Sequence, residues 1–212
     1  MEPPRPWAPP RPLPLPLVTE RLTIDVWRPL DAPSLWEAID TSRSSLIPWL
    51  PWAASGHRDP EETLERIEAW TRQWTAPEPT DVFLGLRDRA TDAIVGMAGF
   101  HQIVPELLQA EIGYWVREER RNQGLCSEAV RALVTSGFRD WGFRRITVEC
   151  AGLNVPSRRV VEKAGLPLEA CFKDARWIDG LGWSDSLVFG VLATEWDLAA
   201  GTPRPGLPAR RS

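Results

Sequence analysis

The sequence predicts a single α/β (α+β) domain, and three observations lead to that prediction. The hydrophobic pattern changes repeatedly between the period of a strand and the period of a helix. The chain has 212 residues, enough for one globular core. Residues 1–16 are rich in proline, which removes backbone donors and favours extended chain. We therefore expect a domain over 17–198, preceded by a disordered proline-rich arm at 1–16 and followed by a flexible tail at 199–212.

Strands are predicted where apolar residues alternate with polar ones or form short runs. In the first such segment, Leu22, Ile24 and Val26 alternate with polar neighbours. Near the C-terminal end, Asp179-Gly180 has the composition of a hairpin turn. The predicted strands cover residues 21–27, 82–86, 94–100, 110–116, 145–150, 168–178 and 186–192.

Helices are predicted from spacing and from end signals. A short one starts at Asp31, and a longer one starts at Asp59, where an N-cap Asp is followed by a proline at the first helical position. Residues 127–141 carry apolar side chains at steps of three and four, which is typical of an amphipathic helix. A helix over 156–163 ends at Gly165, a C-terminal cap.

Composition restricts the function. The chain is 43% hydrophobic and 25% charged, with neither an apolar run of membrane-spanning length nor a secretory signal, so we expect a cytoplasmic location. Three cysteines, Cys126, Cys150 and Cys171, are not spaced as a metal site, so we expect no metal. A net charge of −4 argues against nucleic acid as the ligand and is compatible with an amine. A homodimer is compatible with the sequence.

The segment between the strand ending at Val116 and the helix opening near Ser127 has the features of an anion site. Unpaired backbone N–H groups and the helix dipole converge at such a helix start. Gly124 lets the backbone approach a phosphate closely. On spacing alone, a plain turn explains the same residues equally well.

The surrounding residues resemble a known family. Arg121-Asn122-Gln123-Gly124-Leu125-Cys126 resembles the Arg/Gln-x-x-Gly-x-Gly/Ala signature of GNAT-superfamily acetyltransferases. Within it, the RimJ/RimL-like branch, which acetylates ribosomal protein N-termini, is the most similar over residues 17–197. Besides the loop, the segments that carry this resemblance are Thr19 to Leu22, Arg28 to Ala32, Leu46 to Trp52, Glu111 to Val116, Ser127 to Ala129 and Asn154 to Leu166.

The resemblance implies a fold, a co-substrate and a reaction. The fold is a mixed, mostly antiparallel sheet of about seven strands, splayed between the fourth and fifth strands, with helices on both faces. The co-substrate is acetyl-CoA, whose acetyl group passes directly to a primary amine of a small molecule or of a protein N-terminus, such as that of a ribosomal protein. The residues implied to hold it are Trp115, Val116, Arg121, Asn122, Gln123, Gly124, Leu125, Cys126, Ser127 and Asn154.

Two positions in the loop depart from the family signature. Cys126 stands where Gly or Ala is preferred, and Asn122 where Gly is common. Cysteine is small enough to fit there. A thiol at a helix start can also acquire a lowered pKa and react, but a small residue tolerated in a tight loop is the favoured interpretation.

Ser157 is the candidate for donating a proton or hydrogen bond to the departing thiolate, since it matches the Ser of the family's Asn-x-x-Ser motif. The alternative is a helix-capping hydroxyl. Many family members use a tyrosine for this purpose. The only tyrosine here, Tyr114, falls on a strand rather than on the helix of Ser157, so we do not expect it to be the acid.

The base that removes the ammonium proton has several candidates. Glu111 lies on the central strand where relatives place a carboxylate, although a structural ion pair is the alternative. His101 has a suitable ordinary pKa and is a candidate substrate contact, with a structural histidine as the alternative. Arg176 stands where RimL-like enzymes have a Glu, which leaves ordered water as a further option.

Trp49 and Trp52 are the candidate wall of the acceptor site, because prolines stiffen their segment and indole faces suit apolar or cationic groups. Packing against the core is the alternative for both. A second function from another class is an acyl-CoA sensor or partner-binding module that keeps the loop but has weak turnover.

Overall fold

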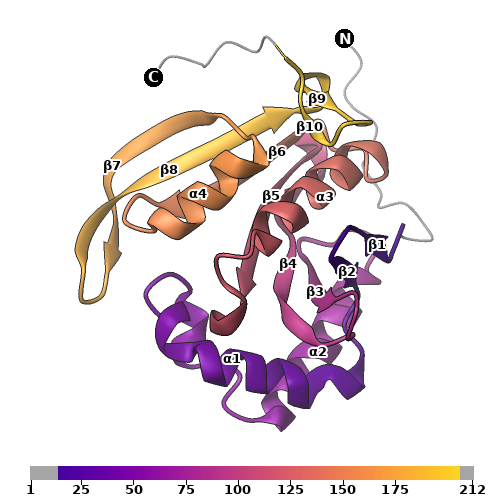
Figure 1. The fold of residues 1–212 in the computed structure, drawn as a ribbon, viewed down its shortest axis with the longest axis vertical. Coiled ribbons are helices and arrows are strands. Elements are labelled where there is room, and N and C mark those ends of the chain that lie inside the picture. Colours follow the sequence, from indigo (N-terminus) through magenta and orange to yellow (C-terminus); the bar gives the residue numbers. More distant parts are fainter. Residues whose placement is uncertain (1–13, 206–212) are drawn as a thin grey trace.

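The computed structural model describes residues 14–205 and confirms the mixed α/β architecture. Its centre is a sheet of eight strands in the order β1-β2-β3-β4-β5-β6-β8-β7, in which only β5 and β6 run parallel (Figure 1). The strands are β1 (Leu17–Val18), β2 (Leu22–Asp25), β3 (Val82–Asp88), β4 (Ile94–Val104), β5 (Gln109–Val116), β6 (Arg145–Ala151), β7 (Leu168–Ile178) and β8 (Gly182–Leu192).

Four α-helices cover the sheet: α1 (Ala32–Leu46), α2 (Pro60–Trp74), α3 (Leu125–Arg139) and α4 (Val155–Ala164). Helices α1 and α2 pack on one face, around a core cluster that includes Leu35, Ile67 and Trp115. Helices α3 and α4 cover the other face, around a second cluster that includes Ile112 and Leu133. Trp115 and Ile112 belong to opposite clusters because side chains separated by an odd number of residues point to opposite faces of a strand.

The expected ends of the helices are present. The Asp59 carboxylate accepts a hydrogen bond from the Glu62 backbone N–H at 2.7 Å, with Pro60 in the first turn of α2. Gly165 closes α4 with a φ of +95°. Helix α1 starts one residue after the predicted Asp31, because Asp31 closes a short 3₁₀ turn and forms a buried ion pair with Arg87.

The structure differs from the prediction in the number of strands and in several boundaries. The eighth strand is the two-residue β1, which pairs with β2. Strand β8 begins at Gly182 rather than at residue 186, so the β7–β8 hairpin is longer than predicted. A separate two-stranded pair joins β9 (Trp196–Asp197) to β10 (Thr202–Pro203). Residues 1–13 of the predicted arm and 206–212 of the predicted tail lie outside the described residues, whereas residues 199–205 of the tail are described and include β10.

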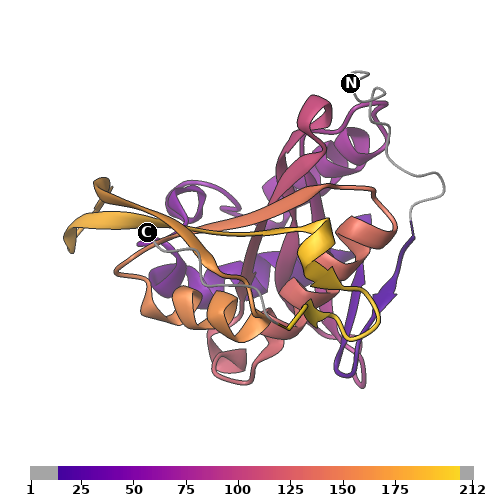
Figure 2. The ribbon, with the colours of Figure 1, turned by 90° about the horizontal axis from the view of Figure 1, so that it is seen from above.

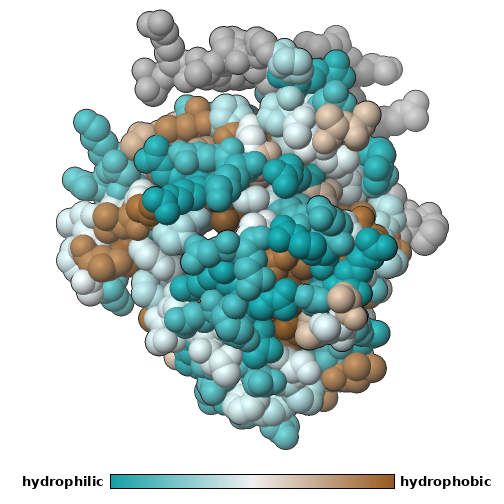
Figure 3. Space-filling model, in the orientation of Figure 1, coloured by the Kyte–Doolittle hydropathy of each residue, from teal (hydrophilic) through white to brown (hydrophobic). Residues whose placement is uncertain are grey.

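The β7–β8 hairpin extends away from the rest of the sheet (Figure 2). Its tip exposes two indoles, since Trp177 and Trp183 are 60% and 62% accessible and lie edge to face at 5.5 Å. Hydrophobic residues are visible over this hairpin on the surface (Figure 3). Leu181 and Phe172 contribute to this exposed set.

Strands β5 and β6 separate after a short pairing. They are in parallel register only from Gln109 opposite Arg145 to Glu111 opposite Thr147. Beyond that point β5 stays paired with β4 as far as Val116, and β6 stays paired with β8 as far as Ala151. The expected splay between the fourth and fifth predicted strands is therefore this opening between β5 and β6.

No helix within residues 14–205 has the length and hydrophobicity needed to cross a membrane.

Candidate functional site

The first turn of α3 presents backbone N–H groups without a side-chain cap. Gly124 is the N-cap and has no side chain to cap the amides that follow it. Two residues adopt left-handed backbone conformations here, Asn122 with a φ of +61° and Gly124 with +79°. A left-handed conformation favours Gly and is tolerated by Asn, which explains both residue types. This turn has the free donors that a phosphate group requires.

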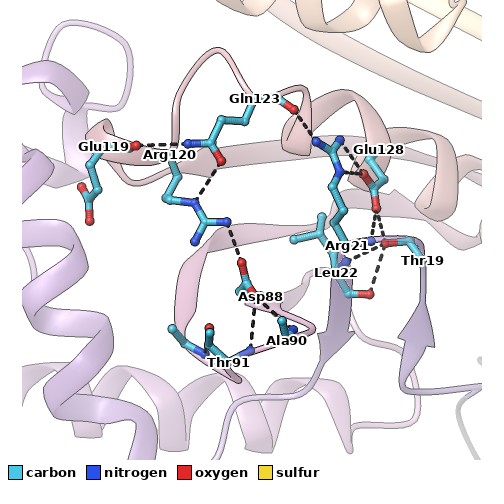
Figure 4. Close-up of polar contacts among 11 residues, drawn as sticks. Thr19, Arg21, Leu22, Asp88, Ala90, Thr91, Glu119, Arg120, Gln123 and Glu128 are labelled. Atoms are coloured by element: carbon cyan, nitrogen blue, oxygen red, sulfur yellow. Dashed lines mark hydrogen bonds and ion pairs between the residues drawn. The ribbon is translucent and has the colours of Figure 1, made fainter.

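Two ion pairs hold this loop to the strands beside it (Figure 4). Arg21, which precedes β2, donates to the Gln123 carbonyl at 2.6 Å and pairs with Glu128 of α3 at 2.7 Å. Arg120 pairs with Asp88 at the end of β3, at 2.6 Å, and also bonds the Gln123 side chain. Since Arg120 is engaged in this way, its charge fixes the loop to the end of β3.

The remaining loop residues are divided between structural and open positions. Arg121 donates to the carbonyl oxygen of Ser45 at 3.3 Å, which ties the loop to the end of α1. Leu125 and Cys126 are buried beneath the turn. The Ser127 hydroxyl donates to the carbonyl of Val160 at 3.1 Å and so joins α3 to α4. Arg121 is half-buried, whereas Asn122, Gln123 and Gly124 are exposed.

Cys126 has the properties of a structural residue. Its side chain is 8% accessible, and burial raises the pKa of its thiol to about 12. The positive charge of Arg121 acts in the opposite direction but is outweighed. This agrees with a small residue tolerated in the loop rather than with a reactive thiolate.

The open edge of β5 supplies further backbone groups. Arg117 donates its N–H to Val95 of β4, and backbone groups alternate along an antiparallel strand. The groups of Trp115 therefore point toward β4, whereas those of Tyr114 and Val116 point toward the splayed side. The Trp115 indole, in turn, packs in the core cluster of α1 and α2. An extended ligand along β5 can thus pair with Tyr114 and Val116.

On the α4 side of the opening, Tyr114 and Ser157 lie together. The Tyr114 hydroxyl is 2.9 Å from Ser157 Oγ and 3.2 Å from the Ser157 carbonyl oxygen. Burial raises the pKa of Tyr114 above its ordinary value, so the phenol stays protonated. Ser157 is positioned by Asn154, whose side chain accepts the Ser157 backbone N–H at 3.2 Å as the N-cap of α4.

The contact between Tyr114 and Ser157 was not expected from the sequence, and it makes Tyr114 a further candidate acid. The sequence separated it from Ser157 because one falls on a strand and the other on a helix. Helix α4 packs against α3 and β6, and Tyr114 projects from β5 toward the start of α4, so the two hydroxyls meet. A signal was available in the alternation of β5, which places Tyr114 on the same face as Ala110 and Ile112.

On the opposite face, Glu111 and His101 lie side by side. They are partners in the β4–β5 register, with His101 Nε2 3.6 Å from Glu111 Oε1. Burial lowers the pKa of His101, and burial together with the charge of Glu149 raises the pKa of Glu111. The structure therefore joins the two candidate bases into one polar group on the sheet.

The sequence interpretation missed Glu149, which belongs to the same group. Its carboxylate accepts hydrogen bonds from Ser186 of β8 and, at 2.5 Å, from Arg176 of β7. Burial opposes its charge, but these donors outweigh burial and hold the pKa of Glu149 below its ordinary value. Alternation along β6 gave the face of Glu149, but only the pairing of β6, β7 and β8 identifies its partners.

The two tryptophans proposed as an acceptor wall lie in different surroundings. Trp52 packs against the core cluster of α1 and α2, with ring centroids 5.7 Å from His57 and 6.3 Å from Trp115. Trp49 is half-buried in the loop after α1. The ring contacts of Trp52 match the alternative of packing against the core, whereas the half-buried Trp49 keeps part of its surface accessible.

Together these features define the class of protein. The opening between β5 and β6, the uncapped start of α3 and the paired hydroxyls of Tyr114 and Ser157 offer hydrogen-bonding groups that suit phosphates and an extended chain. Carboxylates on the other side suit a cationic acceptor. Among residues 14–205, no group of three or more His, Cys, Asp or Glu side chains is arranged to hold a metal ion.

Comparisons with known proteins agree with this class. The family model described as the acetyltransferase (GNAT) domain matches residues 21–167. The chain is 30% identical over 185 residues to YdaF of Bacillus subtilis (strain 168), covering 85% of this chain and 96% of YdaF. It is 27% identical over 184 residues to the [Ribosomal protein uS5]-alanine N-acetyltransferase of Escherichia coli (strain K12), covering 85% and 92%.

A solved structure has the same fold. It is RimL, titled a ribosomal L7/L12 alpha-N-protein acetyltransferase in complex with coenzyme A, and it superimposes with a TM-score of 0.74 at 23% identity. The superposition covers 82% of this chain and 96% of RimL. The chain belongs to the GNAT acetyltransferase family, and it is an N-acetyltransferase of the RimJ/RimL-like type.

Proposed function

We propose that this enzyme binds acetyl-CoA across the opening between β5 and β6 and transfers the acetyl group directly to a primary amine. The observation that carries the proposal is the continuity of the uncapped first turn of α3 with the unpaired edge of β5. The first turn of α3 suits phosphates, and the edge of β5 suits an extended chain that contains amides. Acetyl-CoA supplies an activated thioester.

The proposed donor contacts follow from this geometry. The backbone amides of residues 122–127 and the Arg121 side chain bind the pyrophosphate. The backbone groups of Tyr114 and Val116 pair with the pantetheine arm, and the Val116 region presents an amide to the developing oxyanion. Asn154 fixes the start of α4 beside that arm.

The proton transfers are assigned to the two faces of the opening. The amine nitrogen bonds to the acyl carbon while the carbon–sulfur bond breaks. Tyr114 and Ser157, sharing a hydrogen bond at 2.9 Å, supply a proton to the departing sulfur. Glu111, with His101 as its neighbour, receives the proton that the ammonium group loses.

We propose a protein N-terminus as the preferred acceptor over a small-molecule amine. Relatives are named for such substrates, including the ribosomal-protein-serine acetyltransferase of Escherichia coli (strain K12), 34% identical over 88 residues. The half-buried Trp49 is the proposed contact for the first side chain of the acceptor. A cytoplasmic enzyme that acts on proteins, as a monomer or homodimer, fits this proposal.

Turnover of defined acceptors tests the function. Thiol release from acetyl-CoA is measured with peptides bearing free N-termini, the same peptides with blocked N-termini, and small amines, alongside a thermal-shift titration with CoA. We expect release only with free amines, and greater release with peptides. CoA binding without turnover on every acceptor would instead support the acyl-CoA sensor.

A further inference from the structure

Four polar side chains from four strands meet on the sheet face opposite Tyr114. Glu111 of β5 is the register partner of both His101 on β4 and Thr147 on β6. Glu149 lies two residues beyond Thr147, on the same face of β6. Arg176 reaches this group from β7. The cluster therefore lies where β5 and β6 begin to separate, on the sheet face away from α4.

The two carboxylates have opposite environments. The Glu111 side chain is 15% accessible, and among residues 14–205 its one cationic partner within ion-pair distance is His101, whose pKa is itself lowered by burial. The Glu149 side chain is 30% accessible and has two donors, Ser186 and Arg176. A pair of titratable groups whose surroundings separate their pKa values is typical of a divided acid–base task.

The net charge of the cluster is negative, which favours the binding of one cation. Glu111 and Glu149 carry two negative charges, Arg176 carries one positive charge, and His101 is neutral when its pKa is lowered. Asp81, the other acid that acts on His101, adds negative potential from the start of β3. The cluster with an ammonium group bound is closer to neutrality than the cluster alone, which favours a protonated amine.

We propose that Glu149 and Glu111 form a two-carboxylate acceptor site, in which Glu149 binds the ammonium group of the acceptor and Glu111 takes its proton. This rests on the proposed function and assigns the amine-binding role to Glu149. An ammonium N–H bond breaks, its proton passes to a Glu111 oxygen, and the electron pair stays on nitrogen for attack on the acyl carbon. Arg176 stands at the position where RimL-like enzymes have a Glu. Here it is a positioning residue that keeps Glu149 ionised.

Steady-state kinetics distinguish the proposed role of Glu149 in binding the amine from that of Glu111 in taking its proton. Glu149→Gln keeps an oxygen that can accept from Ser186 and Arg176 but removes the charge, so KM for an N-terminal-alanine hexapeptide should rise about 10-fold, with a smaller change in kcat. Glu111→Gln should lower kcat about 100-fold. Glu149→Asp, which restores the charge, should recover part of the affinity.

The pH profile provides a readout that a structural role would not move. Glu149 raises the pKa of Glu111, so Glu149→Gln should shift the acidic limb of kcat/KM to lower pH. Arg176→Gln should shift the same limb to higher pH, because Arg176 lowers the pKa of Glu111. Glu62→Gln is the matched control: Glu62 also pairs with an arginine, Arg58, but lies on α2.

The outcomes are distinguishable. Absence of turnover by the unchanged enzyme would overturn the proposed function itself. If the enzyme is active but Glu149→Gln leaves peptide KM and the acidic limb unchanged, or if its loss of activity matches a loss of CoA affinity, the two-carboxylate site is wrong. A raised KM and a shifted limb with unchanged CoA affinity support it.

Discussion

The Tyr114 hydroxyl lies 2.9 Å from Ser157 Oγ, across the junction between β5 and α4. The two hydroxyls come from a strand and a helix that the sequence did not bring together, and neither has a charged partner in this contact. Because burial keeps the phenol protonated, the pair can donate a proton or a hydrogen bond without prior ionisation.

Removing either hydroxyl should slow the chemical step. We expect Tyr114→Phe and Ser157→Ala each to reduce kcat by about 100-fold, with CoA affinity changed less than about threefold. The double variant should be little worse than the more affected single variant, because the two groups act together. Single-turnover kinetics and CoA titration measure both quantities. Full additivity of the two losses would show that the hydroxyls act independently.

The α3 turn can be tested at Gly124. Gly124→Glu should weaken CoA binding at least about 100-fold, since it adds a negative charge and a side chain where phosphates are proposed to bind. Gly142→Glu is a matched control, because Gly142 also has a positive φ, +73°, and has no atom within 4 Å of an added Cβ. Both variants should lose similar thermal stability. Equal CoA affinity in both variants would contradict the assignment of the turn.

The sequence correctly predicted the strand that ends at Val116, the loop that contains Gly124 and the helix that follows it. Local signals were sufficient there. The left-handed backbone at Gly124 favours glycine, Asp59 caps the start of α2, and Gly165 closes the end of α4, each through bonds to nearby residues. Tyr114 and Ser157, by contrast, are 43 residues apart and meet because the fold brings the start of α4 close to the Tyr114 side chain. Glu149 was missed for the same reason, since its partners lie on β7 and β8.

His57 should make stability depend on pH. Its ring is 4% accessible, and burial, with Arg66 and Arg43, lowers its pKa from 6.5 to about 4. The folded state therefore favours neutral His57, so its contribution is complete above pH 6.5 and is lost as the pH falls toward 4. The loss is about 3 kcal/mol.

His57→Asn isolates this contribution, because Asn tolerates the φ of +55° at this position. Urea unfolding of both proteins between pH 7 and pH 4 gives the difference in unfolding free energy. We expect the difference to narrow as the pH falls. A constant difference would mean that His57 titrates normally in the folded protein.

The three cysteines should differ in reactivity. Cys171 is exposed, whereas Cys126 and Cys150 are 8% and 5% accessible. Burial raises the pKa of all three thiols, that of Cys171 also through Asp185, so accessibility separates them. Labelling with a disulfide reagent should modify one thiol at least about 100-fold faster than the others. Cys171→Ser should remove this fast phase. A fast phase that persists in Cys171→Ser would show that one of the buried thiols is activated.

The most direct test of the account is a crystal structure of the enzyme with acetyl-CoA. We predict pyrophosphate oxygens within hydrogen-bonding distance of the backbone amides of residues 122–127, with the pantetheine arm along β5 between Tyr114 and Val116. The thioester should then lie between the Tyr114–Ser157 pair and Glu111. Acetyl-CoA bound on another face, with the α3 turn and the β5 edge free of it, would contradict the account.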